Sequence, residues 1–138
     1  MAKFFEIVIF TAALQEYADQ VIDQIDVGKA IKYRLYRQHC SQNGPFLVKD
    51  LSLLGRDMHR TIIIDNISDN FIIQPDNGIF CSTWYDDMSD TFLEDISPLL
   101  MEVVDKKVPD VRKALRSYRD QVLRQISNGA RQPHIKFE

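Results

Sequence analysis

Residues 1–26 read MAKFFEIVIFTAALQEYADQVIDQID, and this stretch decides the fold class. Residues 7–10 form a continuous apolar run, which is typical of a strand buried on both faces of a parallel sheet. The next residues repeat apolar side chains at the spacing of one helical face, which predicts an amphipathic helix over 14–26. Its apolar face consists of Leu14, Tyr17, Ala18, Val21, Ile22 and Ile25, and Gly28 is predicted to stop it.

The rest of the chain keeps alternating between strand-like and helix-like segments. Strands are predicted at residues 5–10, 32–37, 61–65 and 79–82, and helices at residues 14–26, 91–104 and 109–127. Local signals add a hairpin at Asn43-Gly44-Pro45 and a short helix that begins at Ser68 and stops at Pro75. For the helix predicted at 91–104, they add a cap at Asp90 or Thr91 and a kink or restart at Pro98. This alternation indicates an α/β fold, with a mostly parallel sheet and flanking helices.

Composition limits the classes of protein to consider. A chain of 138 residues with 45% hydrophobic residues suits one domain with a real core. The net charge of −3 excludes a generally basic protein that coats nucleic acid. The two cysteines, Cys40 and Cys81, fit no metal or redox motif and indicate reduced thiols in an intracellular protein, whether nuclear, cytoplasmic or mitochondrial. We expect no membrane span and no signal peptide, because the first apolar run fits a strand better.

Charge is distributed unevenly along the chain. Residues 106–138 contain nine Lys and Arg against three acidic residues, which gives +6 and leaves −9 for the rest. The predicted last helix carries an apolar stripe of Val111, Leu115, Tyr118, Val122 and Ile126, and basic residues Arg112, Lys113, Arg116, Arg119 and Arg124. We expect this helix to dock, either on the acidic remainder of the chain or on another protein. RNA binding is a weaker reading, because only Tyr118 and Phe137 are available for stacking.

Candidate site residues follow the predicted strands. Thr11 follows the first strand, Asp65 and Asn66 end the third, and Lys49 lies between them in the chain. The carboxyl ends of parallel strands meet at one edge of the sheet, where the sites of such folds lie. A hydroxyl and an ammonium group there suit phosphate oxygens, and a carboxylate suits magnesium.

Several segments in order resemble one family. They are FFEIVIFTAALQEYADQVIDQID, YRLYRQHC, VKDLSLLGRDMHRTIIIDN, FIIQPDNGI and TWYDDMSDTFLEDISPLL. The sequence is identified as a member of the small CTD phosphatase, or NLI-interacting-factor-like (Dullard-like), group of the haloacid dehalogenase superfamily. The resemblance covers residues 1 to about 104, so we read residues 1–105 as the C-terminal portion of the phosphatase domain and residues 106–138 as a basic helical extension and tail.

The resemblance implies a magnesium-dependent Ser/Thr phosphatase that forms an aspartyl-phosphate. By match to the family pattern, Thr11 binds the phosphoryl group, Lys49 neutralises its charge, and Arg37 lies near the substrate phosphate. Asp65 matches the magnesium-binding acid and Asn66 the residue beside it. The hairpin over 39–47 falls where the family has its substrate-recognising insertion. The fold implied is a partial Rossmann-like parallel sheet of the haloacid dehalogenase type.

Two departures limit this reading. The family pattern D-N-S-P is here D-N-I-S, with Ile67 and Ser68, which argues against magnesium binding. The D-x-D-x-T motif, whose first Asp is the nucleophile, does not occur in this sequence, and Asp86, Asp87 and Asp90 follow the wrong strand to replace it. Met1 therefore matches an interior position of the family domain, which suggests a truncated, late-started, split or shortened chain.

The missing segment includes the central strand of the family's sheet. We therefore expect either direct pairing of strands 5–10 and 61–65 or another polypeptide in the gap, and we favour the second. The favoured function is a structural or interaction subunit, inactive as an isolated chain. The alternative is a phosphatase whose nucleophile comes from an upstream segment or a second chain, with Mg²⁺ as cofactor and a phosphoprotein as substrate.

Overall fold

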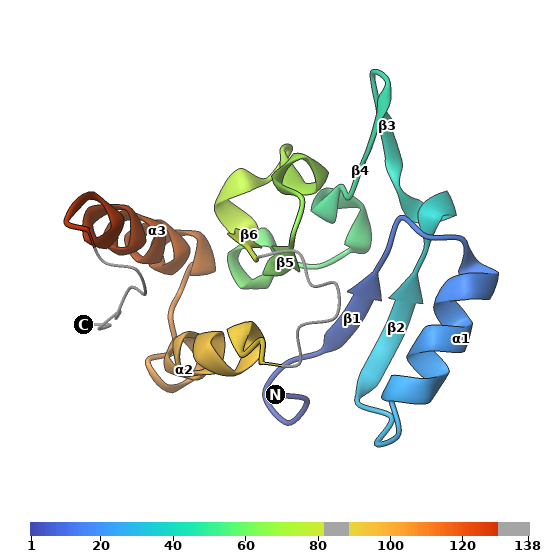
Figure 1. Ribbon diagram of the computed structural model, residues 1–138, viewed down its shortest axis with the longest axis horizontal. Helices are drawn as coiled ribbons and strands as arrows, with labels where there is room; N and C mark the ends of the chain where they lie inside the picture. The colour runs from blue at the N-terminus through green and yellow to red at the C-terminus, as the bar shows by residue number, and fades with distance from the viewer. Residues whose placement is uncertain (82–88, 130–138) are drawn as a thin grey trace. The chain divides into compact units, whose positions relative to one another are not determined.

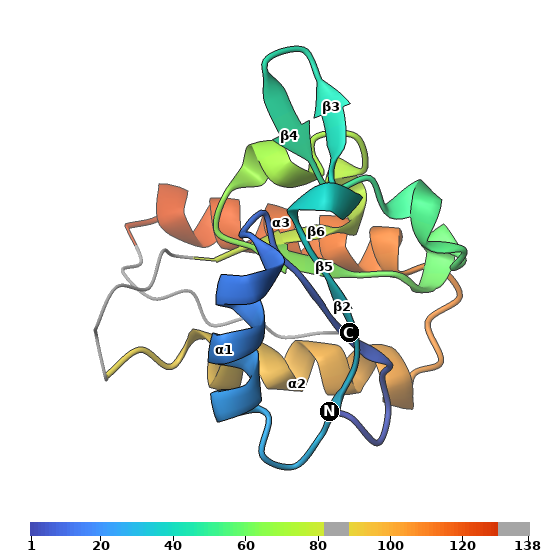
Figure 2. The same cartoon turned by 90° about the vertical axis from the view of Figure 1, so that its right-hand side faces the viewer.

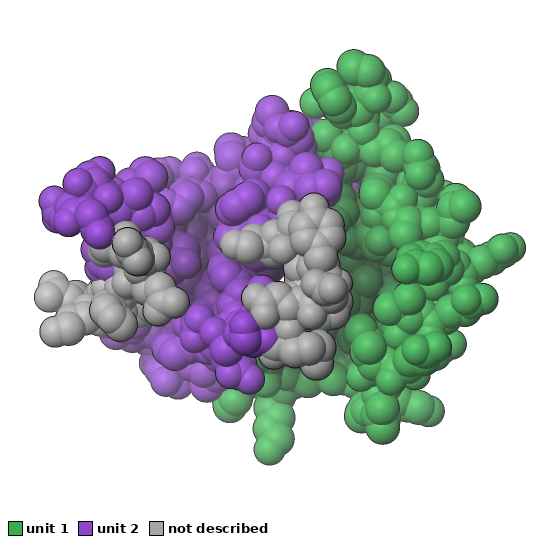
Figure 3. All heavy atoms as spheres, in the orientation of Figure 1, with its two compact units in different colours: residues 1–50 green, residues 51–138 purple. Residues whose placement is uncertain are grey.

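The computed structural model describes residues 1–81 and 89–129. These residues divide into two compact units, 1–50 and 51–138 (Figure 3). The predicted α/β class is confirmed, because both units combine parallel strand pairs with helices or helical turns. No helix in the described ranges has the length and apolar character that crossing a membrane requires.

The first unit is built on a strand–helix–strand segment. Strand β1 (Ile7–Phe10) pairs in parallel with β2 (Ile31–Leu35), and helix α1 (Gln15–Ile25) runs alongside the pair (Figures 1 and 2). The helix buries Ala18 and Ile22, which pack with Tyr36 against partly buried residues of β1 and β2. The strand and helix predicted from the opening residues are thus confirmed, although β1 begins two residues later than expected.

Helix α1 ends earlier than predicted, and Gly28 is not its stop. The C-cap is Asp26, whose carboxylate accepts hydrogen bonds from the backbone N–H groups of Ala30 (2.8 Å) and Ile31 (3.3 Å). Gly28 lacks the left-handed conformation of a C′ glycine; Lys29 has that conformation instead, with φ of 50°. At the helix end the backbone N–H of Asp26 donates to the Ile22 carbonyl, and the Asp26 carboxylate then holds the turn into β2, so no glycine cap is present.

The predicted hairpin is confirmed. After the short 3₁₀ turn η1 (Arg37–His39), β3 (Ser41–Asn43) pairs antiparallel with β4 (Phe46–Val48). Asn43 pairs with Phe46, which leaves Gly44 and Pro45 as a two-residue connection. Gly44 has φ of 62°, a conformation that glycine adopts at little cost.

The second unit contains the other parallel strand pair. Strand β5 (Ile63–Asp65) pairs in parallel with β6 (Gly78–Phe80). Four 3₁₀ turns lie before β5 and between the strands: η2 (Leu51–Leu54), η3 (Met58–Arg60), η4 (Ser68–Phe71) and η5 (Pro75–Asn77). Two of them, η4 and η5, replace the single short helix predicted from residue 68. Strand β6 ends at Phe80, and the predicted last strand residue, 82, lies outside the described residues, as do Asp86, Asp87 and Phe137.

Two helices complete this unit. Helix α2 (Phe92–Asp105) continues through Pro98, so the predicted restart there is wrong, whereas a kink at Pro98 stays a prediction. The N-cap is Thr91, one of the two predicted cap residues, and the Asp90 carboxylate before it accepts from the Phe92 backbone N–H at 2.9 Å. Helix α3 (Val111–Ser127) is capped by Asp110, ends at Asn128-Gly129, and closely matches the predicted range.

The apolar stripe of α3 packs inside its own unit. Leu115 is fully buried and contacts Ile79 of β6 together with Ile96 and Leu99 of α2, while Tyr118 is partly buried beside them. The docking predicted for this helix is therefore intramolecular along most of the stripe. Ile126, the last residue of the stripe, remains more than half exposed.

The single parallel sheet that we predicted is only partly present in the structure. Within residues 1–81 and 89–129, the strands form three separate two-stranded sheets: β1–β2, β3–β4 and β5–β6. Within its own unit β1 pairs with β2, and β5 pairs with β6. Direct pairing of β1 with β5, one of the two alternatives for the gap, stays a prediction, because each unit is described by itself.

We predict that Gly78→Ala destabilises the protein. A Cβ atom on buried Gly78 would overlap the ring of Phe71, so the variant should lose about 1–3 kcal/mol of unfolding free energy. Gly28→Ala is the matched control, because nothing lies within 4 Å of the added methyl group and the backbone there is ordinary. Urea denaturation of both variants checks this, and equal midpoints for the two would contradict it.

Candidate functional site

Thr11 lies at the carboxyl end of β1 and shapes the turn that follows. Its Oγ1 accepts from the Ala13 backbone N–H at 3.0 Å, and its own N–H donates to the Leu35 carbonyl at 2.9 Å. The Arg37 N–H in turn donates to the Ala13 carbonyl at 3.2 Å. The loops after β1 and β2 are therefore joined, and Thr11 and Arg37 lie at the same end of this strand pair.

Lys49 follows the hairpin and is buried. Its side-chain nitrogen lies 5.8 Å from the ring centroid of Phe10, the residue before Thr11. Only 8% of Lys49 is exposed, which is rare for a lysine because an ammonium group loses its hydration on burial. The first unit thus brings Thr11, Arg37 and Lys49 to the carboxyl ends of β1 and β2, as the sequence predicts for part of the site.

A side-chain network holds the end of β2 against α1. Asp19 accepts from the Tyr36 hydroxyl at 2.5 Å and from the Arg34 guanidinium at 3.0 Å. Arg34 also pairs with Asp23 at 2.8 Å. The hydrogen bond from Tyr36, and then that from Arg34, lower the pKa of Asp19 below its ordinary value, while the same carboxylate raises the pKa of Tyr36. This network fixes the residue that precedes Arg37, and sequence patterns gave no signal for it.

Asp65 is the buried carboxylate of the second unit. It ends β5, is 6% exposed, and accepts from the Ile67 backbone N–H at 3.0 Å. The Asn70 amide donates to both of its oxygens at 3.2 Å. The loop therefore orients this carboxylate despite the substitution of Ile67 and Ser68 for the family residues. Asn70, which sequence reasoning missed, lies one turn after Asp65 and performs part of that orientation.

These groups form two half-sites, one in each unit. The first contains Thr11, Lys49 and Arg37, which suit a phosphate group, and the second contains Asp65 with Asn66 beside it, which offer oxygen ligands. The predicted convergence of Thr11 with Asp65 stays a prediction, because each unit is described by itself. In the described ranges, no three His, Cys, Asp or Glu side chains form a metal-binding group.

Comparisons with known proteins place this chain among phosphatases. The family profile described as NLI interacting factor-like phosphatase matches residues 1–112. A probable C-terminal domain small phosphatase of Dictyostelium discoideum is 46% identical over 120 residues, which cover 87% of this chain and 39% of that protein. The carboxy-terminal domain RNA polymerase II polypeptide A small phosphatase 1 of Homo sapiens is 42% identical over 119 residues, or 86% of this chain and 45% of that protein.

A third relative extends the same pattern. CTD small phosphatase-like protein 2 of Dictyostelium discoideum is 40% identical over 116 residues, which cover 84% of this chain and 20% of that protein. The chain therefore spans less than half the length of each of these three relatives. The family resemblance drawn from the sequence is confirmed over most of the chain.

We predict that the Asp19 network stabilises the protein in a pH-dependent way. The pKa of Asp19 is lower in the folded state than the usual unfolded value of about 3.9, so its contribution is complete above that value. The contribution disappears as the pH falls through the folded-state pKa. Asp19→Asn should therefore lower the melting temperature at pH 7 and lose that effect progressively as the pH falls below the unfolded value and through the folded-state pKa.

Glu16→Gln is the matched control, since Glu16 is another exposed carboxylate of α1. Thermal melts from pH 2.5 to pH 7 would contradict the prediction if both variants shifted the melting temperature equally at every pH. Tyr36→Phe should raise the Asp19 pKa in an NMR titration, because the variant removes the hydroxyl donor.

Proposed function

This chain belongs to the family of NLI interacting factor-like phosphatases, and we propose that its 138 residues are an incomplete Ser/Thr phosphatase domain. We further propose that the domain is inactive alone and acts as an interaction subunit. The observation that carries the proposal is the burial of Lys49 and Asp65 at strand ends, in a sequence without D-x-D-x-T. Phosphate- and metal-binding chemistry is retained, whereas the nucleophile that would form the aspartyl-phosphate is not among these residues.

The phosphate-binding role falls to the first unit. The Lys49 ammonium would neutralise a phosphoryl group, and the Thr11 hydroxyl would donate a hydrogen bond to one of its oxygens. Arg37 begins the exposed turn after β2 and would contact the phosphate of an incoming phosphoprotein. Because the Thr11 hydroxyl accepts from the Ala13 N–H and the Arg37 backbone N–H donates to the Ala13 carbonyl, the backbone of both residues is held at one end of β1 and β2.

The second unit fits part of a magnesium site. Asp65 and Asn66 would hold Mg²⁺, which needs only one or two protein carboxylates when waters and phosphate oxygens complete its shell. When bound, the ion would neutralise charge on the phosphoryl oxygens. Asn70 keeps the Asp65 carboxylate turned in one direction through its two hydrogen bonds, so the ligand is oriented by the chain itself.

Open strand edges support the interaction role. Each of β1 and β5 has one strand partner within its own unit, and the second edge of a strand would offer backbone donors and acceptors to an added strand. A strand from another polypeptide would satisfy these groups by strand addition. We place the interaction of this subunit there, at the edge of β1 or of β5.

The second candidate function is a phosphatase completed by another segment. The retention of Thr11, Lys49 and Asp65 together favours it, since a purely structural domain has no need of a buried lysine and a buried carboxylate at its strand ends. The nucleophile would then come from an upstream segment or from a second chain that bears D-x-D-x-T, and the substrate would be a phosphoprotein.

We predict that the purified 138-residue chain does not hydrolyse p-nitrophenyl phosphate in the presence of magnesium. Loss of the attacking carboxylate removes the covalent route and should cost many orders of magnitude in rate. The matched control is the Thr11→Ala, Asp65→Asn double variant. Turnover by the parent chain above that background would show that these residues supply their own nucleophile.

We further predict that a polypeptide bearing the D-x-D-x-T strand of a relative binds this chain. Hydrogen exchange should then show new protection of the backbone amides in 7–10 or 63–65, because the added strand pairs with an open edge. Binding without p-nitrophenyl phosphate hydrolysis supports the interaction subunit. Hydrolysis that Lys49→Met abolishes supports the second candidate, and the absence of binding rejects a strand-adding partner of this kind.

A further inference from the structure

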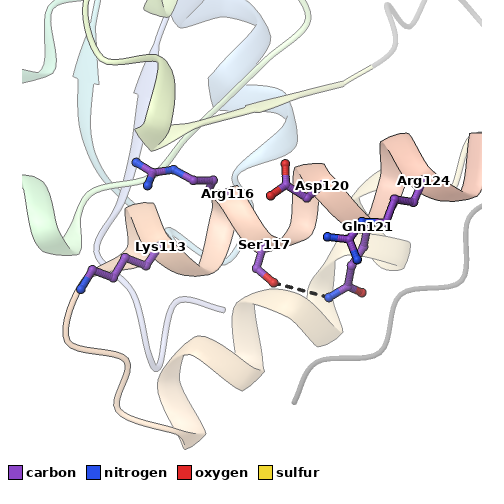
Figure 4. Close-up of a pocket in the computed structure, with 6 residues that line it drawn as sticks. All are labelled: Lys113, Arg116, Ser117, Asp120, Gln121 and Arg124. Atoms are coloured by element: carbon purple, nitrogen blue, oxygen red, sulfur yellow. Dashed lines mark hydrogen bonds between the residues drawn. The ribbon is translucent and has the colours of Figure 1, made fainter.

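The exposed side of α3 carries a basic hollow that is separate from both half-sites. Six side chains line an open hollow of about 370 Å³ along this helix (Figure 4): Lys113, Arg116, Ser117, Asp120, Gln121 and Arg124. Lys113 and Arg124 lie at its two ends, and the Gln121 amide donates to the Ser117 hydroxyl between them at 3.5 Å. Three cations and one carboxylate therefore share one strip of helix surface.

Most of these positive charges do not hold α3 to the rest of its unit. Arg119, on another side of α3, holds the helix to its unit by donating to the Pro75 carbonyl at 2.8 Å and pairing with Asp76 at 2.9 Å. Arg116 shares Asp76 at 3.2 Å, but its side chain is 61% exposed. Within residues 1–81 and 89–129, neither Lys113 nor Arg124 has a carboxylate within 4.0 Å. These two cations are thus available to a ligand.

The spacing of the two available cations defines a ligand length. Residues 113 and 124 are eleven positions apart, so they lie on the same helix face, about 16 Å apart along the axis. An extended peptide covers that distance in about five residues. Because Val111 and Leu115 are buried in the core of the unit, α3 presents the cations at a fixed separation.

An apolar pocket adjoins the basic hollow. A smaller hollow of about 90 Å³ between α2 and α3 is lined by Leu99, Val103, Val108 and Ala114 and by the ion-paired Glu102 and Lys106, and it shares Ser117 and Gln121 with the first. A ligand lying on the basic strip would therefore reach an apolar recess without leaving α3. Charge at two ends and an apolar recess beside them are the features of a peptide site.

We propose that this face of α3 binds an acidic segment of a partner protein, with carboxylates about five residues apart and one apolar side chain between them. Asp120 lies between Arg116 and Arg124 and would repel a continuous row of phosphates. Among the described residues that line the hollow, none is an aromatic on which bases would stack. These two features favour an acidic protein segment over a nucleic acid.

The test measures fluorescence anisotropy of a labelled eight-residue peptide with paired Glu residues at both ends and Leu near the centre. The peptide should bind the full chain, and its affinity should fall as salt rises, because exposed ion pairs are screened. Lys113→Glu combined with Arg124→Glu should weaken binding at least tenfold. Lys3→Glu combined with Lys32→Glu changes the net charge equally at exposed positions elsewhere and should bind like the parent chain.

Three results would overturn the proposal. They are no binding of the peptide by the parent chain, equal loss of affinity in the two double variants, and tighter binding of a single-stranded oligonucleotide that depends on Lys113 and Arg124. Matching circular dichroism melts of the variants would show that a lost affinity is not lost folding. The assay needs no hydrolysis and no added strand, so its outcome is independent of the phosphatase and strand-addition experiments.

Discussion

Parallel pairing ties β1 to β2 and β5 to β6, and the other elements of each unit are arranged around these two ladders. A buried backbone N–H or C=O without a partner costs about 1–3 kcal/mol, so each strand needs a neighbour before its apolar side chains can be buried. In the first unit, α1 then covers the pair through Ala18 and Ile22. In the second, Ile79 of β6 provides the surface on which α2 and α3 meet.

The candidate groups are positioned mainly by the loops that carry them. The turn after β1 is fixed by the Thr11 hydroxyl and the Ala13 amide, and the Asp65 carboxylate is fixed by its own loop through Ile67 and Asn70. Short-range hydrogen bonds of this kind form whenever the loop forms, whether or not a ligand is present. The turn at Thr11 and the Asp65 carboxylate are therefore each held in place by local contacts.

Sequence patterns predicted the elements that have a strong period or a strong turn signal. Helices α1 and α3, the hairpin at Gly44 and the strand ends that carry Thr11 and Asp65 belong to this group. The 3₁₀ turns were missed or read as one helix, because three or four residues are too few to show a period. The stop at Gly28 was wrong because α1 ends at the Asp26 C-cap, where the Asp26 carboxylate holds the turn into β2, and composition does not reveal this contact.

Hydrogen-bond networks between distant side chains were also not predicted from the sequence. Asp19 and Tyr36 are seventeen residues apart, and nothing in either local pattern indicates their hydrogen bond. The buried Asn77 amide donates to the carbonyls of Met58 and Thr61, again across a long separation. Such contacts depend on how segments pack, so they emerge only with tertiary structure. The family resemblance supplied the roles of Lys49 and Arg37, which no single local pattern would have given.

The attachment of α3 also sets an order for folding during synthesis. Arg119 lies 41 residues after Gly78, whose carbonyl it contacts, and Leu115 completes the core around Ile79. The short β5–β6 pair therefore lacks its covering helix until the ribosome has released the chain through α3. The first unit has its strand pair and its helix within fifty residues and can close much earlier. Until α3 is released, Ile79 of β6 lacks the cover that Leu115 gives it in the folded unit.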